Sequence, residues 1–439
     1  MSCSKPWKSS FIVSNVQDRQ SSTCEAPVNK GVSGTIAAPT ILYIHGASDL
    51  YGASRSLLRL VTRIDRRRFN PCVVLPDDGP LVGALKRSGV PVIIMPSLSV
   101  VTRHVFHSLR LLQFLLRLPL SVLALASLIR RERVSIVHSN VGVAVSAGAA
   151  AKLAGVPHIW HVRDSFREFG VLWKGYARYI LWSSVRVVCV SHAVAAQFQP
   201  GSPKVVVVHN GLPLEEFEGV TDARVERFRN KYDLLGKRLV GVVGRIKFQR
   251  KGQEIFVQAA QLLKDKFDDV RFLIIGSPFP GNESHLQCLR ELIEELRLCD
   301  RVILTGDVDD IQAAYRSLDV LVLPSCQPEP FAGVVLEAMA LGVPVVGTRT
   351  GGTVEQIEDG ISGLLAEPNN VEMLAGAIER LLTDRGLRES ICKAAHARVA
   401  ERFSFETMWQ KLEALYASPL AQRTAPSTTM KGSGTECGG

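Results

Sequence analysis

Short runs of apolar, mostly β-branched residues recur along the whole chain, and each is followed by a turn and then by a segment with helical periodicity. Continuous apolar runs of this length are typical of parallel strands that are buried on both faces. In the first half the runs are ILYIHG, CVVLP, VPVIIMP, VSIVHSN, PHIWHV, VRVVCVS and KVVVVHN, and in the second half they are RLVGVVGR, VRFLIIGS, RVILTGD, LDVLVLPS, VPVVGTR and SGLLAE. The pattern predicts an α/β protein with two doubly wound, Rossmann-like domains in series.

The strand pattern is interrupted once, in NGLPLEEFEGVTDARVERFRNKYDLLGKR, and 439 residues exceed what one hydrophobic core usually organises. We therefore expect an N-terminal domain over residues 38–215, a C-terminal domain over 216–400 and a last helix over 401–418. The ends, 1–37 and 419–439, are rich in Ser, Thr, Gly and Pro, which predicts disordered tails. Ligands of such sheets bind beyond the carboxyl ends of the strands, so two facing domains predict an interdomain cleft.

Cysteine usage and charge narrow the class of protein. The nine cysteines form no C-x-x-C pair and no zinc-type spacing, which predicts a reduced, cytoplasmic chain. The start, MSCSKPWKSSFIVSN, contains no apolar segment of signal-peptide length, so export is not expected. The net charge of +10 is compatible with lipid, nucleic acid or phosphorylated ligands. The sequence contains no signature of a nucleic-acid-binding module, so nothing specific supports nucleic acid. No H-x-x-x-H pair indicates a metal site, and the histidines at 45, 138, 192 and 209 fit a purely structural role.

One apolar stretch, residues 105–134, raises the question of a membrane. Arg110, Gln113, Arg117 and Pro119 interrupt it and leave LPLSVLALASLI as the longest clean run, which is too short to span a bilayer. It is interpreted as one or two core helices. The alternative is a helix that rests on anionic lipid, because arginines border the stretch over residues 103–133.

Two loops at predicted strand ends could bind phosphate. In VGRIKFQRKGQEIF, Arg245 follows Gly244 at the end of a strand and Lys251 precedes a helix, so the two cations could converge on a diphosphate. The alternative is a solvated basic loop. In YIHGASDLYGASRSLL, Gly52 precedes a helix whose N–H groups could approach a phosphate, although neither the dinucleotide motif nor the P-loop motif is present.

Three further side chains could contact a polar ligand. His161 ends the predicted strand HIWHV, where an imidazole could donate to a hydroxyl or a carbonyl, or could serve only the core. In PSCQPEPFAGVVLEAMALGVP, Glu329 stands in a proline-bordered loop and Glu337 lies inside a helix that begins near Ala332 or Gly333. The helix start suits a phosphate, and the two carboxylates suit hydroxyl groups at its two sides. As the alternative, both glutamates are ordinary surface charges.

Taken together, these motifs resemble the family-four retaining glycosyltransferases, which have two facing Rossmann-like domains, the GT-B fold. The resemblance runs from about residue 40 to residue 417. It rests on the arginine and lysine at the diphosphate position, ILTGDV, the E-x7-E pattern of EPFAGVVLE, GVPVVGTRTGGTVE and DGISGLLAE. The chain departs from the common pattern in EPFAG, where Ala332 replaces a glycine, and in Gly52-Ala53-Ser54, where Gly-Gly-Ala is commoner.

The resemblance implies a role for each candidate residue. Arg245 and Lys251 would neutralise the diphosphate of a nucleoside-diphosphate sugar after Gly244, Glu337 would hold the ribose, and Glu329 would face the transferred sugar. His161 would contact that sugar near its reacting carbon, and Gly52 would line the phosphates. The remaining donor contacts would be the base at the Val308 backbone and the distal phosphate at the helix start, Ala332, Gly333 and Val334.

The resemblance also implies transfer of a hexose from a UDP- or GDP-linked donor with retained configuration, no cofactor and no obligatory metal. The acceptor is expected to be a saccharide, most simply a lipid-linked one in envelope polysaccharide synthesis, on the inner face of the membrane. A soluble acceptor is the alternative. Two other functions fit the same fold, namely a sugar-nucleotide epimerase and a non-catalytic partner that binds the nucleotide sugar.

Overall fold

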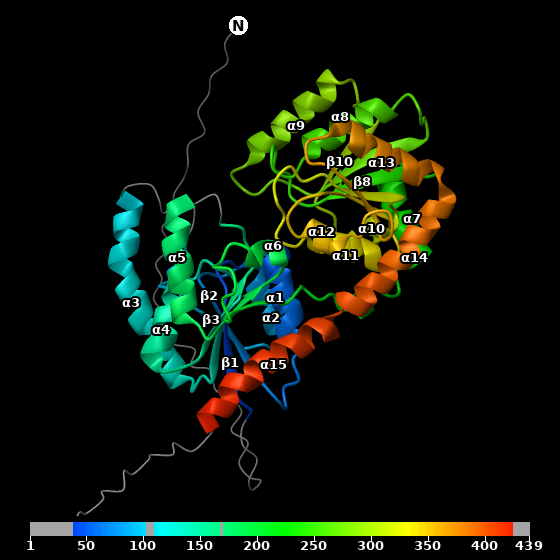
Figure 1. The fold of residues 1–439 in the computed structure, drawn as a ribbon. Coiled ribbons are helices and arrows are strands. Elements are labelled where there is room, and N and C mark those ends of the chain that lie inside the picture. The colour runs from blue at the N-terminus through cyan, green and yellow to red at the C-terminus, as the bar shows by residue number, and fades with distance from the viewer. Residues whose placement is uncertain (1–37, 102–108, 167–169, 425–439) are drawn as a thin grey trace, which may run out of the picture. The chain divides into compact units, whose positions relative to one another are not determined.

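The computed structural model describes residues 38–101, 109–166 and 170–424. Two parallel sheets organise this part of the chain, a seven-stranded sheet in the order β3-β2-β1-β4-β5-β6-β7 and a six-stranded sheet in the order β10-β9-β8-β11-β12-β13. Every pair of neighbouring strands is parallel. The structure confirms the α/β prediction, since each predicted apolar run is a strand of one of the two Rossmann-like sheets (Figure 1).

The first sheet is built from β1 (Thr40–Ile44), β2 (Asn70–Leu75), β3 (Val92–Ile94), β4 (Ile136–Ser139), β5 (His158–Val162), β6 (Arg186–Cys189) and β7 (Val205–Val207). Its helices are α1 (Gly52–Arg63), α2 (Pro80–Arg87), α3 (Leu109–Arg131), α4 (Val145–Ala154), α5 (Gly170–Ser183) and α6 (His192–Ala195). The strand β1 pairs with both β2 and β4, so the strand order reverses beside it, and ligands of doubly wound sheets bind at such a point.

The second sheet is built from β8 (Arg238–Val243), β9 (Val270–Ile275), β10 (Val302–Gly306), β11 (Val320–Leu323), β12 (Val345–Thr348) and β13 (Leu364–Ala366). Its helices are η3 (Leu214–Phe217), α7 (Asp222–Lys231), α8 (Gln253–Leu263), α9 (Glu283–Glu295), α10 (Ile311–Arg316), α11 (Gly333–Ala340), α12 (Thr353–Gln356), α13 (Val371–Thr383) and α14 (Arg385–Arg402). Here β8 lies between β9 and β11, which is the corresponding reversal point.

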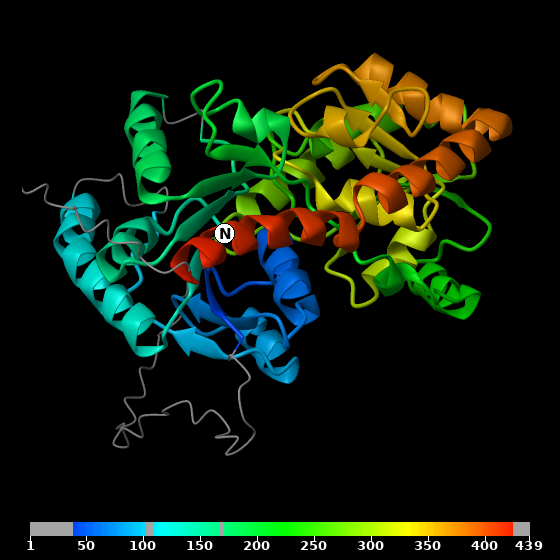
Figure 2. The ribbon, with the colours of Figure 1, turned by 60° about the horizontal axis from the view of Figure 1, so that its bottom comes forward.

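The last helix, α15 (Phe405–Thr424), follows the helices of the second sheet but packs against the first sheet (Figures 1 and 2). Its buried side chains Phe405, Met408, Leu412 and Tyr416 share a core cluster with Ile41 and other residues of the first sheet. Because these four side chains are buried, the last helix is anchored to the first sheet. The helix extends beyond residue 418, so residues 419–424, predicted to begin a disordered tail, are helical. Residues 1–37 and 425–439, the rest of the predicted tails, lie outside the described residues.

The helix α3 differs from the prediction. It continues through Arg117 and Pro119, and Leu111–Arg131 forms one helix of 21 residues. Its most apolar window of 18 residues has a mean hydropathy of 1.9, so the helix is long and apolar enough, by length and composition, to cross a membrane. The prediction that this stretch is too short was therefore wrong, because a single proline does not end the helix. Only 28% of the most apolar window is buried. The second half packs in the core through Leu125, Ala126, Leu128 and Ile129, as predicted, whereas the first half exposes a row of leucines.

Candidate functional site

Arg245 follows the carboxyl end of β8, and its guanidinium group lies over the ring of Tyr51, with Cζ 4.3 Å from the ring centroid. A second ring, that of Phe279, lies 5.7 Å from the same Cζ. Tyr51 immediately precedes Gly52, the first residue of α1. The stack therefore brings together the predicted basic loop and the predicted glycine loop. Space remains on both sides, because a Cβ atom added at Gly52 or at Gly244 would meet no atom within 4 Å.

Lys251 and Glu329 are joined directly, with the ammonium Nζ 2.7 Å from the carboxylate Oε1, and Ser325 donates to the same oxygen at 2.9 Å. Gly252 makes this contact possible. It has a φ of +71°, and a Cβ there would lie 1.9 Å from the carbonyl oxygen of Pro324. Only glycine lets the loop that carries Lys251 lie so close to the end of β11. The sequence predicted both residues at one site, and the structure places them in contact.

The carboxylate of Glu329 is ionised in this setting. Burial raises its pKa, but attraction to Lys251 and the hydrogen bonds from Lys251 and Ser325 outweigh burial and lower the pKa below its usual value. Ionisation leaves the side chain as an acceptor that can take hydrogen bonds from hydroxyl groups. It also leaves a negative charge that can stabilise a positive charge nearby.

The loop around Glu329 is supported from the segment before α12. The N–H of Gly352 donates to the carbonyl of Glu329 at 2.7 Å, and a Cβ at Gly351 would lie 2.3 Å from that carbonyl oxygen. Gln356 brackets Ala332, accepting from its N–H at 3.2 Å and donating to its carbonyl at 2.8 Å. Ala332 is thereby fixed as the N-cap of α11, which begins at Gly333 as predicted.

The start of α11 is open to a ligand. Gly333 would carry a Cβ with no atom within 4 Å, and Val334 is only half-buried. The first N–H groups of a helix have no partner inside the helix and carry a partial positive charge. This end of α11 can therefore hold an anionic group.

Glu337, further along α11, is buried and engaged on both oxygens. Arg59 of α1 places Nη1 and Nη2 each 3.1 Å from Oε1, and Tyr315 donates to Oε2 at 2.9 Å. Arg59 also contacts Glu216 at 2.8 Å. The carboxylate has lone pairs left for a hydroxyl group, because each oxygen can accept more than one hydrogen bond.

His161 ends a buried chain of polar side chains. The hydroxyl of Tyr43 lies 3.2 Å from that of Tyr416, which lies 2.8 Å from Nδ1 of His138, and Nε2 of His138 lies 3.3 Å from Nδ1 of His161. Arg163 Nη2 lies 3.4 Å from the same Nδ1 and can only donate. His161 therefore accepts at Nδ1 and carries its proton on Nε2. Among the described residues no atom accepts that proton, although Nε2 is fully buried.

Both imidazoles of this chain are neutral. Burial, together with the positive charge of Arg163, lowers the pKa of His138 and that of His161 well below the usual value. Burial also lowers the pKa of Arg163, to about 10, so this residue remains charged at neutral pH. An unpartnered N–H in such a place costs free energy unless a ligand accepts from it.

Asp164 connects this end of β5 to the basic loop. Burial raises its pKa, and the positive charges of Arg163, Arg250 and Arg245 oppose that rise, so the aspartate lies within electrostatic range of all three. The structure thus gathers the ends of β5 and β8. It does not add Val308 to the group, since this half-buried residue packs against the apolar core, and within the described part of the chain no hydrogen bond or ion pair joins it to the others.

Sequence reasoning missed four residues that hold the predicted ones in place, namely Tyr51, Arg59, Tyr315 and Arg163. One signal was available, because Arg55, Arg59 and Arg63 recur at every fourth position of α1 and Glu215 and Glu216 follow as an acidic pair. Arg63 in fact binds both glutamates at 2.9 Å. Nothing in the spacing indicated Tyr315.

Two family models match the chain. The model described as Glycosyltransferase Family 4 matches residues 51–216, and the model described as Glycosyl transferases group 1 matches residues 224–398. They lie on the first and the second sheet, respectively.

Individual relatives agree with these matches. A D-inositol 3-phosphate glycosyltransferase of Corynebacterium urealyticum is 33% identical over 220 residues, 49% of this chain and 51% of that protein. The capsular polysaccharide biosynthesis glycosyltransferase CapM of Staphylococcus aureus is 31% identical over 208 residues, 47% of this chain and 52% of that protein. This chain thus matches about half the length of each curated relative. The crystal structure of Anabaena HepE with UDP-glucose is 23% identical, covers 86% of this chain and 99% of that one, and superposes with a TM-score of 0.74, which shows the shared GT-B fold.

Proposed function

The chain belongs to glycosyltransferase family 4, and from this premise we propose that it transfers a hexose from a UDP- or GDP-linked sugar to an acceptor. The configuration at the anomeric carbon is retained. His161, Arg245, Lys251 and Glu329 act on the reacting part of the donor. Gly52, Gly244, Val308, Gly333 and Glu337 are among the residues that bind the rest of it.

The unpartnered N–H of His161 carries this proposal. It is buried at the carboxyl end of a parallel strand, where doubly wound sheets bind ligands, and its tautomer is set by Arg163 and His138. A neutral imidazole that can only donate at this atom suits a sugar hydroxyl, which is a neutral acceptor.

Cationic side chains supply the chemistry at the diphosphate. As the bond between sugar and diphosphate breaks, negative charge grows on the leaving group, and Arg245 and Lys251 stabilise it. Fixing Arg245 over Tyr51 before the donor binds reduces the reorganisation needed in the transition state. Lys251 reaches the diphosphate from its contact with Glu329 and remains paired with that carboxylate.

Glu329 faces the sugar in this mechanism. Its ionised carboxylate accepts from sugar hydroxyls in the ground state and stabilises the positive charge that develops on the ring in an oxocarbenium-like transition state. The reaction requires neither an obligatory metal nor a second carboxylate as nucleophile, unlike the usual glycosidase mechanism.

The exposed face of α3 supports an acceptor at a membrane surface. Leu112, Leu115, Leu116, Leu120 and Leu123 are each more than half exposed and recur at intervals of three and four residues, so they form one stripe along the helix. Arg117, Arg130 and Arg131 are exposed on the same helix.

Because the second half of α3 packs in the core of the first sheet, lipid cannot surround the helix along its length, and the helix instead lies on the surface. Arginines of such a helix favour an anionic surface. We therefore place the protein in the cytoplasm, peripheral on the inner face, with a lipid-linked saccharide as acceptor. The similarity to CapM supports a role in polysaccharide synthesis. The similarity to a D-inositol 3-phosphate glycosyltransferase is the reason to test a soluble acceptor as well.

One experiment tests this function. The purified chain is incubated with radiolabelled UDP- and GDP-sugars, each with bacterial lipid extract, with D-inositol 3-phosphate or with no acceptor. A labelled product that appears only with an acceptor supports transfer and identifies the donor and the acceptor class. Conversion of the donor without acceptor would show an epimerase instead, and donor binding without turnover in all arms would show a non-catalytic partner.

A further inference from the structure

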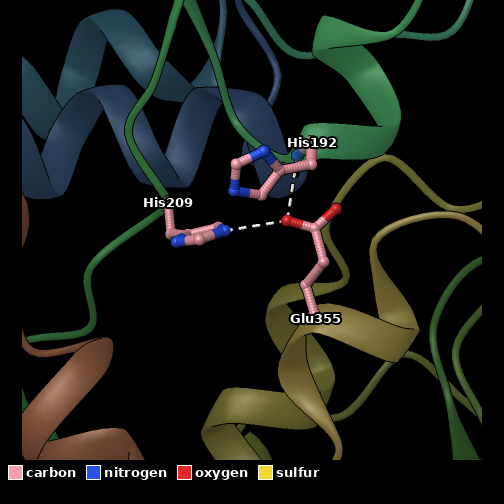
Figure 3. A group of neighbouring side chains, drawn as sticks. All are labelled: His192, His209 and Glu355. Atoms are coloured by element: carbon pink, nitrogen blue, oxygen red, sulfur yellow. Dashed lines mark hydrogen bonds and ion pairs between the residues drawn. The ribbon is translucent and has the colours of Figure 1, made fainter.

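A group of metal-ligating side chains lies outside the residues used above. His192 is the first residue of α6, His209 follows β7, and Glu355 belongs to α12. Figure 3 shows the three side chains turned toward one another, with Nε2 of His209 2.9 Å from Oε2 of Glu355. One ligand atom of each residue lies within 4.8 Å of the other two. The sequence indicated nothing of the kind, because 146 positions separate His209 from Glu355.

Two of the three side chains are already held in place. The ring of His209 stacks on Phe331 with a centroid distance of 5.2 Å, and Phe403 meets it edge-on at 5.5 Å. The carboxylate of Glu355 accepts from the backbone N–H groups of His192 at 2.9 Å and of Ala193 at 3.0 Å. These outer contacts orient the ligand atoms, as the surroundings of bound metal ions generally do.

We propose that His192, His209 and Glu355 bind one divalent transition-metal ion of the Zn²⁺ type. Two imidazoles and one carboxylate are ligands that suit zinc, whereas Mg²⁺ and Ca²⁺ prefer oxygen ligands alone. Zinc bound by about 2.0–2.2 Å bonds in a tetrahedron holds its ligand atoms about 3.3 Å apart. The ligand atoms lie within 4.8 Å of one another, so binding draws them closer together, and the exposed side chain of His192 is able to move. Water completes the coordination from the solvent side.

The metal ion replaces the proton that His209 shares with Glu355. When Nε2 binds the ion, its proton moves to Nδ1 or to solvent, and no bond between heavy atoms breaks. Glu355 binds through Oε2 and keeps its hydrogen bond from Ala193 on Oε1.

The position of the cluster predicts a structural effect and not a chemical one. Glu355 lies three residues after Gly352, whose N–H holds the carbonyl of Glu329. A bound ion therefore fastens α6 and the His209 segment to the segment that supports the Glu329 loop. This role is independent of the proposed transferase reaction, which needs no metal.

Binding is tested on the full chain, chelator-treated and free of any histidine tag. We expect calorimetric titration to give one equivalent of Zn²⁺, a higher melting temperature with Zn²⁺, and neither effect with Mg²⁺. His209→Gln keeps a donor toward Glu355 but loses the ligand atom, and His192→Asn loses the second imidazole. Loss of a residue that only orients a metal ligand weakens binding by about 10–100-fold. We expect each of these two variants to weaken Zn²⁺ binding by more than that, because each removes a ligand.

His396→Gln is the matched control, since His396 is exposed on α14 and is not one of the three clustered residues. It should bind Zn²⁺ as the unchanged chain does. Titration with Co²⁺ distinguishes the ligands, because imidazole and carboxylate give d–d bands without the thiolate charge-transfer band that the exposed Cys288 or Cys299 would produce. No binding by the unchanged chain, equal binding by His209→Gln, or a thiolate band would each overturn the proposal and leave His209 and Glu355 as an ordinary ion pair.

Discussion

Arg59 directs two N–H groups at one oxygen of Glu337, with Nη1 and Nη2 both 3.1 Å from Oε1. The side chains are 17% and 9% exposed, so the pair is largely removed from water. Because Arg59 comes from α1 and Glu337 from α11, the pair links a helix of the first sheet to a helix of the second. The predicted ribose ligand thus also has a structural role.

Removing Arg59 should destabilise the protein. Arg59→Ala leaves a buried carboxylate without its cation, and we expect the free energy of unfolding to fall by about 3 kcal/mol. In Arg59→Ala/Glu337→Gln the charge is gone as well, so the double variant should lose less than the sum of the single losses. Urea unfolding of all four proteins measures this. If Arg59→Ala lowers the free energy of unfolding by less than about 1 kcal/mol, the pair contributes no more than an ordinary surface ion pair.

Arg245 and Lys251 should both be needed for turnover. We expect Arg245→Ala and Lys251→Ala each to lower kcat by about a hundredfold or more, the usual scale for removing one preorganised donor from a developing anion. Normal turnover with an unchanged melting temperature would show that the residue concerned does not reach the diphosphate.

Tyr51 should matter through its ring alone. Tyr51→Ala removes the surface on which Arg245 stacks, so turnover should fall, whereas Tyr51→Phe keeps the ring and should behave as the unchanged protein. Steady-state kinetics on the two variants decides this. Equal loss in both would mean that the hydroxyl group, and not the stacking, is what the site requires.

Acid should begin to destabilise the fold at pH values well above those at which carboxylates titrate. Burial lowers the pKa of His45 to about 4 and that of His158 to about 3, and it also lowers the pKa values of His138 and His161. The unfolded chain binds protons at these rings near pH 6.5, so their stabilisation is fully present above pH 6.5 and is lost as the pH falls. Each ring contributes a slope of about 1.4 kcal/mol per pH unit until its folded pKa is reached. Urea unfolding at pH 7.5, 6.5 and 5.5 measures the slope, and equal stability at the three values would contradict the assignment of neutral buried rings.

The sheets were predictable from the sequence because each strand is one short apolar run and the order of runs and helices defines a doubly wound fold. Lys251 and Glu329 were both predicted to bind the donor, but at the diphosphate and at the sugar, respectively, so their direct contact did not follow from the motif. Contacts between residues of different sheets, such as that of Arg59 with Glu337, could not be predicted from the sequence. Nothing in the local sequence of either helix indicates which helix it packs against.

The helix α3 was misjudged for a different reason. Proline and arginine were taken as interruptions, although packing of the second half against α4 and the first sheet stabilises the whole helix. His192, His209 and Glu355 are a third case. The two histidines were interpreted as structural and Glu355 was not singled out, and only the folded chain brings one ligand atom of each residue within 4.8 Å of the other two.

The leucine stripe of α3 should bind anionic membranes. Arg103, which borders this stretch, lies outside the described residues, and the test therefore uses the leucines. We expect partial sedimentation with anionic liposomes at low salt, less with neutral liposomes and less at high salt, because each basic residue near such a surface contributes about 1 kcal/mol. Leu112→Gln/Leu116→Gln/Leu120→Gln should abolish it. Leu235→Gln/Leu262→Gln, at exposed leucines elsewhere, is the control. Equal recovery of the protein in the supernatant with both kinds of vesicle would show that the leucine stripe does not bind anionic membranes.

The two glutamates of the E-x7-E pattern should fail differently, because the proposed mechanism assigns them to different ends of one donor. Glu337→Gln should mainly raise the donor KM, since a ribose contact changes little between ground state and transition state. Glu329→Gln should mainly lower kcat, because the contact with the sugar strengthens as the ring becomes positive. The amide keeps the size of each side chain, and Lys251 keeps an oxygen acceptor at position 329.

A nucleoside diphosphate without sugar separates the two roles. Calorimetric titration should show weaker binding for Glu337→Gln and nearly unchanged binding for Glu329→Gln, since this ligand has a ribose and a diphosphate but nothing for Glu329 to hold. Tyr315→Phe is a useful third variant, because it removes the hydroxyl group that donates to Oε2 of Glu337 while leaving the charge in place. Its binding should fall between that of Glu337→Gln and that of the unchanged chain if the orientation of the carboxylate contributes to ribose binding. Equal weakening in both glutamate variants, or the reverse order, would show that the two carboxylates are assigned to the wrong ends of the donor.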